Sequence, residues 1–414
     1  MLPEFITDKT HYLDIIKNNW LAAGDTFPDF LSEISDETKL KNEQYIITLT
    51  ADLQKHFNCF PRLPIGRKKW RQKVITLIKD FLYQETIINI HNCTDQIRLD
   101  AFLDEIFDFL RQVRKFAPEL SFEDIGQAIR NYVVYVMFKE INLIQTGFSM
   151  AGFGYSMLYP FTDNYIDSIN YSSSDKVIYN QIIRDKIEGK EVFPKSIHHR
   201  KTCDLLQAIA SDYSNDQSSH VSKLLLMMLE AQEKSIIQQK QDMILTHEER
   251  LDITIEKGGI SVLIDRFLIN KECTKDDLIF YLGVGFFLQL ADDLQDIKSD
   301  YMQGYQTVFT DDLNSEHEEK LVHKMLYFIH DIMVSYQADN DHFKNFILSN
   351  CYQLIYTSVI GSKEFFSDEF LDKIGKRLPV SYTFYEQWRK NLIHSQDIKI
   401  QKKHRKLLDG LLFS

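Results

Sequence analysis

Two clusters of acidic residues are the part of this chain whose types and spacing could do chemistry. The first is Asp-Asn-Tyr-Ile-Asp at residues 163–167, and the second is Asp-Asp-Leu-Gln-Asp at residues 292–296. In each cluster the outer carboxylates are four residues apart, so on a helix they project from one face. Carboxylates held together against apolar surroundings are unfavourable unless cations neutralise them. Two such clusters on facing helices would therefore bind Mg²⁺ together with a polyphosphate.

The second cluster adjoins a strongly apolar segment. The residues that share its helix face by the i, i+3, i+4 rule are Gln289, Asp292, Asp293 and Asp296. The preceding residues 282–290 are rich in leucine and phenylalanine. An acidic helix end in solvent is the alternative interpretation, and the adjoining apolar run argues against it.

The first cluster follows a segment rich in glycine and aromatic residues. Its candidate metal ligands are Asp163, Asn164 and Asp167, and Pro160 either begins or kinks the helix that holds them. This motif is weak alone and gains weight from the second cluster. The aromatic side chains that could line an apolar cavity beside the metal, or belong to an ordinary core, are Phe148, Phe153, Tyr155, Tyr159 and Phe286.

The elements that must position these side chains are helices. Apolar residues recur at steps of three and four over residues 99–113, and no alternating strand pattern persists. Only 15 glycines and 8 prolines occur in 414 residues, which favours long helices joined by short loops. Capping boxes that predict helix starts are Ser121 with Asp124, Thr246 with Glu249, and Thr274 with Asp277. The sequence therefore predicts an all-α protein.

A break in the helical pattern divides the chain near its N-terminus. Residues 61–66 contain two prolines and a glycine. We therefore expect an N-terminal helical extension at residues 1–65 and a larger helical domain at residues 66–414.

Charge and hydropathy exclude some classes of function. The 48 basic and 60 acidic residues give a net charge of −12, which argues against broad nucleic-acid binding. The basic segments 67–73 and 399–406 are local exceptions, which we interpret as solvated helix faces. The chain has no uninterrupted apolar stretch of transmembrane length and no secretion signal, and its five cysteines lack metal-site spacing. We expect a cytoplasmic protein with no transmembrane segment.

The second cluster resembles a known family motif. The sequence Gln-Leu-Ala-Asp-Asp-Leu-Gln-Asp at residues 289–296 is similar to the second aspartate-rich motif of class I isoprenoid synthases. That family includes trans-prenyltransferases, terpene synthases and large-terpene synthases. Residues 163–167 then take the place of its first aspartate-rich motif. Lys257, followed by two glycines, lies where the family has a diphosphate-binding lysine at a helix break.

The resemblance implies a fold, an activity and a set of site residues. The fold would be a class I isoprenoid synthase-like helical bundle around a central apolar cavity, and a homodimer is one assembly that it allows. The activity would be a Mg²⁺-dependent terpene synthase that ionises an allylic prenyl diphosphate and releases diphosphate. The implied catalytic residues are Asp163, Asp167, Asp292, Asp293 and Asp296, with Mg²⁺ held by Asp163, Asn164, Asp167, Asp292 and Asp296. The implied diphosphate contacts are Lys257, Arg184 and Gln289.

Other readings of the same residues stay open. The second motif favours a chain-elongating trans-prenyltransferase that uses isopentenyl diphosphate, whereas the asparagine in the first motif and the lack of an arginine pair closely after it favour the synthase. A helical metal-dependent phosphohydrolase could use His330-Asp331 with His198-His199. A non-catalytic helical scaffold that retains a metal site is the remaining alternative.

Overall fold

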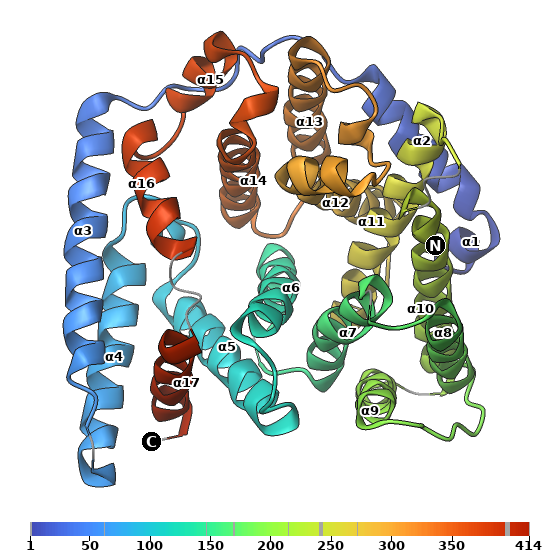
Figure 1. Cartoon of the computed structure of the whole chain (residues 1–414), viewed down its shortest axis with the longest axis horizontal. Coiled ribbons are helices and arrows are strands. Elements are labelled where there is room, and N and C mark those ends of the chain that lie inside the picture. Colours follow the sequence, from blue (N-terminus) through green and yellow to red (C-terminus); the bar gives the residue numbers. More distant parts are fainter. Residues whose placement is uncertain are drawn as a thin grey trace.

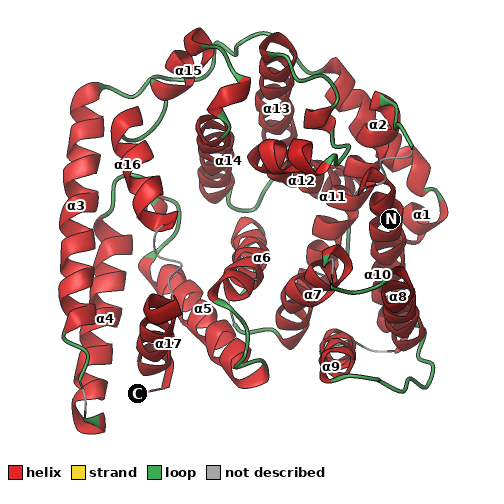
Figure 2. Ribbon diagram, in the orientation of Figure 1, coloured by secondary structure: helices red, strands yellow, loops and turns green. Residues whose placement is uncertain are grey.

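The chain folds into an all-α architecture. The computed structural model describes residues 2–61, 63–145, 147–168, 170–213, 215–239, 243–270, 272–393 and 398–413. Within these ranges it contains helices and no strands, as Figure 2 shows. The α-helices are α1 (Leu2–Thr7), α2 (Lys9–Ala22), α3 (Asp36–Asn58), α4 (Pro64–Gln84), α5 (Gln96–Phe116), α6 (Phe122–Ile141), α7 (Met150–Asp167), α8 (Ser173–Ile187), α9 (Ile197–Ser211), α10 (Asn215–Ser235), α11 (His247–Ile269), α12 (Lys275–Gln303), α13 (Ser315–Ser335), α14 (Asp341–Gly361), α15 (Asp368–Gly375), α16 (Tyr382–Ile393) and α17 (Ile398–Phe413). The prediction of an all-α protein is confirmed.

The helices that carry the two acidic clusters belong to one part of the molecule. In Figure 1, α7, α10, α11 and α12 lie on one side of α6, whereas α3 and α4 run side by side along the opposite edge. Short 3₁₀ turns join several helices, including Val308–Thr310 after α12. The candidate chemistry is thus confined to the helices around α6.

Two glycines allow α11 and α12 to pack at very close range. A Cβ atom added to Gly258 would lie 2.5 Å from the carbonyl oxygen of Gly285, and one added to Gly285 would overlap the carbonyl oxygen of Gly258. Contacts this short do not occur between a real Cβ and backbone, so neither position accepts a side chain without movement of a helix. Main-chain atoms therefore set the distance between these two helices.

Local signals placed the helix ends correctly. The capping boxes at Ser121, Thr246 and Thr274 are all present, at the starts of α6, α11 and α12. Gly189, which follows α8, has φ +76°, a conformation that glycine adopts without strain. Pro160 lies inside α7 and does not begin it.

The N-terminal residues contribute to the main core. Trp20 on α2 is 1% exposed and packs edge-on against Phe286 and Phe328, with ring centroids 5.5 and 6.0 Å away. Further along, α3 ends at Asn58 and α4 begins at Pro64, where the break in the pattern was expected. No helix among the described residues is long and apolar enough to span a bilayer.

Candidate functional site

Three aspartates of α12 form the centre of the candidate site. Asp293 is buried, and its Oδ1 accepts a 3.0 Å hydrogen bond from Nε2 of Gln289. Its Oδ2 is buried and accepts no hydrogen bond from a described residue. Asp292 and Asp296 contact solvent, yet burial raises the pKa of all three carboxyls, to about 8 for Asp293. Asp293 is therefore enclosed by protein, whereas Asp292 and Asp296 are exposed beside it and have protein near enough to hinder the solvation of their charge.

Two cationic side chains from other helices face this position. Burial and the neighbouring Asp296 raise the pKa of Asp292, while the charges of Lys257 on α11 and Arg130 on α6 act in the opposite direction. Arg130 opposes the effect of burial at Asp296 as well. Lys257 and Arg130 are thus within electrostatic reach of the carboxylates. A diphosphate bound there would be near both positive charges.

Asp163 of the first cluster is held from α10. Its side chain is buried, and its Oδ1 accepts a 2.6 Å hydrogen bond from Nε2 of Gln232. A buried amide that donates to a carboxylate fixes the direction of that carboxylate. The side chain of Asp167, the other predicted ligand on this helix, lies outside the described residues.

Asn164 links the first cluster to α6. Its Nδ2 donates to Oδ1 of Asp124 at 2.8 Å and to Oε1 of Gln127 at 3.0 Å. Arg130, which faces the aspartates of α12, follows Gln127 by one helical turn on the same helix. The N-terminal half of α6 therefore contacts the first cluster and brings one cation within electrostatic reach of the second.

A second connection runs through α10 and α11. Gln232 on α10 binds Asp163, and Lys234 two residues later forms a 2.7 Å ion pair with Glu256 on α11. Glu256 is followed directly by Lys257, which faces the α12 aspartates. Side-chain contacts thus connect α7 to α10 and α10 to α11, and α11 packs directly against α12. The two acidic clusters therefore lie on helices of one connected group.

The helix break that the resembled family has beside its lysine is absent at Lys257. The helix α11 continues without interruption through Gly258 and Gly259. A Cβ atom at Gly259 would lie 3.1 Å from Cδ2 of Leu282, so this glycine too faces α12. The two glycines serve close helix packing, and Lys257 projects from a regular helix.

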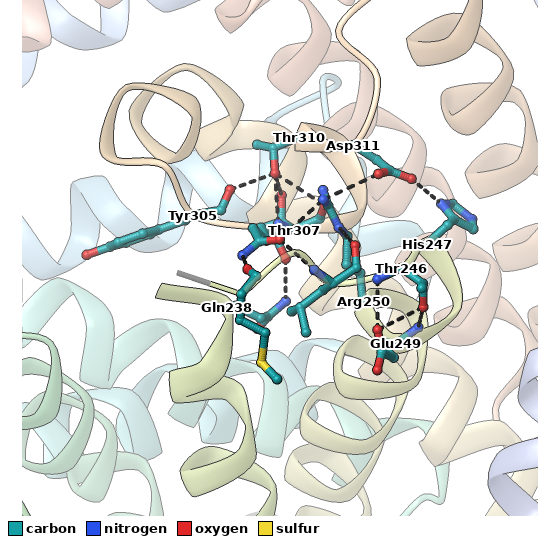
Figure 3. A network of polar contacts seen from close by, with 12 residues as sticks. Gln238, Thr246, His247, Glu249, Arg250, Tyr305, Thr307, Thr310 and Asp311 are labelled. Carbon is teal, nitrogen blue, oxygen red and sulfur yellow. Dashed lines mark hydrogen bonds and ion pairs between the residues drawn. The ribbon is translucent and has the colours of Figure 1, made fainter. Parts of the chain in front are cut away.

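The start of α11 is fixed by a polar network shown in Figure 3. Nη1 of Arg250 donates to the carbonyl oxygen of Thr307 at 3.2 Å, and Nη2 lies 3.4 Å from Oδ1 of Asp311. Nδ1 of His247 lies 3.0 Å from Oδ2 of the same aspartate. These contacts join the first turn of α11 to the segment after α12. They fix the two helices relative to each other along their axes.

One carboxyl near this network has an unusual environment. Glu318 on α13 is 0% exposed, and neither of its side-chain oxygens has a hydrogen-bond partner among the described residues. Burial, with the charges of Asp312 and Asp311, raises the pKa of Glu318 to about 9. The folded state therefore keeps this carboxyl neutral at pH values where the unfolded chain ionises it.

We expect Glu318→Gln to stabilise the protein, and more so as the pH rises. Between the ordinary pKa of 4.5 and the folded value of about 9, stability decreases with pH because only the unfolded state releases the proton. The amide removes this loss, which amounts to a few kcal/mol at pH 8 at about 1.4 kcal/mol per pH unit. Melting temperatures at pH 5 and pH 8 check the difference. Glu316→Gln, at an exposed position on the same helix, is the control and should change little at either pH. Equal effects of the two substitutions would contradict the raised pKa of Glu318.

Arg184 is engaged by acidic residues of α10. Its guanidinium lies 2.9 Å from Oε2 of Glu233 and 3.6 Å from Oε1 of Glu230. These ion pairs join α8 to α10, which also carries Gln232. A diphosphate contact would have to compete with both carboxylates, so a role in positioning α10 is the direct reading of the geometry.

The five predicted cavity aromatics have different environments. Phe153 and Phe286 are completely buried and pack against other aromatic rings as core residues. Tyr155 is partly buried and donates a 2.7 Å hydrogen bond to a backbone carbonyl of α11. Phe148 is partly buried, and Tyr159 is 37% exposed. The cavity role of these residues stays a prediction.

The carboxylate oxygens of α12 suit a Mg²⁺ ion that also binds the phosphate of a substrate. No three histidine, cysteine, aspartate or glutamate side chains are gathered into a ready metal site within the part of the chain that the structure describes. Mg²⁺ commonly uses one or two carboxylates and takes its remaining ligands from water and substrate phosphates. Asp292 and Asp296, which are exposed and one helical turn apart, offer such a pair of carboxylates, whereas the unbonded Oδ2 of Asp293 is buried.

The histidines of the phosphohydrolase alternative are held in separate structural contacts. Nδ1 of His330 on α13 lies 2.8 Å from the hydroxyl of Tyr352. Nε2 of His198 on α9 lies 2.8 Å from the carbonyl oxygen of Phe161. The two histidines share no described contact.

Arg130 and Gln232 are site residues that the sequence did not reveal. Each is one of several polar residues on its helix, and no motif marks it out from the others. Their roles depend on which helices pack together, and no local spacing encodes that.

Comparison of the chain with protein-family models, with curated protein sequences and with solved structures found no match.

Proposed function

We propose that this protein is a Mg²⁺-dependent class I terpene synthase that ionises an allylic prenyl diphosphate and releases diphosphate. The observation that carries the proposal is the group of aspartates on α12 with two cations, Lys257 and Arg130, within electrostatic reach of Asp292. The helix of the other acidic cluster, α7, is connected to α11 through α10. The proposed fold is correspondingly a class I isoprenoid synthase-like bundle around an apolar cavity.

The described residues suit the binding and release of diphosphate. Bound Mg²⁺ would supply positive charge beside the departing phosphate oxygens. Lys257 and Arg130 bring further cationic charge to the same position, where it favours the separated anion over the intact ester. Gln289 donates to Asp293 and orients it.

The proposal is tested by incubating the purified protein with C10, C15, C20 and longer prenyl diphosphates, each with Mg²⁺ or with EDTA. Diphosphate release and extracted hydrocarbons are measured for each substrate alone and with isopentenyl diphosphate. Mg²⁺-dependent release from a single substrate, with a new terpene, is the expected result. Release only in the presence of isopentenyl diphosphate would assign the protein to the chain-elongating prenyltransferases. If no substrate releases diphosphate, and Mg²⁺ plus diphosphate does not raise the melting temperature, the synthase proposal is rejected in favour of the non-catalytic scaffold.

A further inference from the structure

The two basic segments of the sequence lie side by side in the structure. Trp70 on α4 and Leu407 on α17 are buried together in a small apolar cluster. Nε of Arg71 donates a 2.7 Å hydrogen bond to the carbonyl oxygen of Leu411. Figure 1 shows α17 beside α4 and α5, on the other side of α6 from α11. Basic residues that are far apart in the sequence are therefore concentrated on one surface. The helices that form this surface are not those of the candidate site.

A hollow opens between these helices. It has a volume of about 600 Å³, within the range of small-molecule sites. The residues that line it are Phe60, Arg67, Arg114, Arg405, Lys406, Asp409, Gly410 and Phe413. Four of these side chains are cationic and one is anionic. The anionic one is occupied, because Asp409 accepts two hydrogen bonds from Arg114, at 2.9 and 3.2 Å. The lining thus carries an excess of positive charge.

Neutral groups hold the other cations in place. The ring of Phe60 lies 5.4 Å from the guanidinium of Arg67 and 5.9 Å from Nζ of Lys406. Nη2 of Arg405 donates a 3.0 Å hydrogen bond to the carbonyl oxygen of Leu120. Aromatic rings and carbonyls orient a cation without cancelling its charge. Arg405 and Lys406 are therefore positioned in advance and remain able to bind an anion.

Gly410 shapes the floor of the hollow. A Cβ atom at this position would lie 2.7 Å from Cζ of Phe60, so only glycine lets α17 approach the ring this closely. Phe413, at 49% exposed, adds apolar surface at the rim. The hollow consequently combines an aromatic surface with a cationic one.

We propose that this hollow binds an organic phosphate, with the phosphate against Arg405 and Lys406 and the apolar or ring portion against Phe60 and Phe413. Planar guanidinium and ammonium groups are the usual phosphate ligands in proteins. Aromatic surface beside them favours a ligand that carries more than the anion. The proposal does not depend on the function assigned to the α12 aspartates.

Titration in metal-free buffer with EDTA tests the proposal by calorimetry, with inorganic diphosphate, ADP and a C15 prenyl diphosphate as the probes. The double variant Arg405→Glu/Lys406→Glu should weaken binding of the organic phosphates by at least about tenfold. Lys403→Glu, an exposed position on the same helix outside the hollow, is the control and should bind as the parent does. Preference for ADP or for the prenyl compound would identify the source of the ligand.

A milder substitution keeps the test valid if the double variant does not fold. Phe413→Ala removes apolar surface at an exposed terminal position and should weaken ADP or prenyl diphosphate without changing binding of inorganic diphosphate. The proposal is overturned if no probe shows saturable binding at millimolar concentration. It is also overturned if the folded charge-reversed protein binds as tightly as the parent.

Discussion

Replacing Asp292 with asparagine is expected to lower Mg²⁺-dependent diphosphate release by at least about a hundredfold, with the fold retained. Asp292 contacts solvent and faces both Lys257 and Arg130, so it is the α12 carboxylate best placed to share a metal with a substrate. The amide keeps the shape of the side chain and removes its charge. Release of diphosphate from the preferred prenyl substrate, measured over a range of Mg²⁺ concentrations, gives the effect.

Asp276→Asn is the matched control for this experiment. Asp276 is an exposed aspartate in the first turn of the same helix, and none of the candidate residues contacts it. We expect this variant to release diphosphate at the parent rate. If Asp292→Asn keeps full metal-dependent activity, the α12 aspartates do not bind the metal and the synthase proposal fails.

Adding a methyl group at the contact between α11 and α12 is expected to destabilise the protein by about 3 kcal/mol, as for overpacked cores. In Gly258→Ala the new Cβ would lie 2.5 Å from a backbone oxygen and 2.7 Å from Cβ of Gln289. Backbone cannot rotate away as a side chain can, so the helices must separate. Unfolding by guanidinium chloride, followed by circular dichroism, measures the loss.

Gly126→Ala is the control for the effect of helix propensity. Gly126 lies within α6, and a Cβ atom there would meet nothing within 4 Å. The variant should be as stable as the parent or more stable by up to about 1 kcal/mol, because alanine favours the helix. A Gly258→Ala protein that unfolds at the parent midpoint would show that the two helices are not in close contact in solution.

The sequence predicted the local structure well because the signals for it are local. A capping box needs only four consecutive residues, and those at Ser121, Thr246 and Thr274 all begin helices. The spacing of the aspartates within residues 289–296 likewise needs only the helix that contains them. These features can be predicted without knowledge of any other part of the chain.

Features that depend on packing between distant segments could not be predicted. Arg130 faces Asp292 only because α6 lies beside α12, and Lys257 lies in a continuous helix because its neighbouring glycines contact another helix. The basic segments were interpreted as separate solvated faces, whereas Trp70 and Leu407 pack them together. In each case the deciding partner is far away in the sequence, where composition and periodicity carry no signal.

The contact between Gly258 and Gly285 also makes the spacing of α11 and α12 independent of the side chains elsewhere in the site. Lys257 adjoins the first of these glycines, and Gln289, which orients Asp293, packs against it. The spacing between the helix backbones that carry the cation and the carboxylates is consequently set by main-chain contact. Side chains elsewhere could be exchanged, by evolution or by an engineer, to admit substrates of another length while that spacing stayed constant. Selectivity and charge geometry would then be independently adjustable properties of one scaffold.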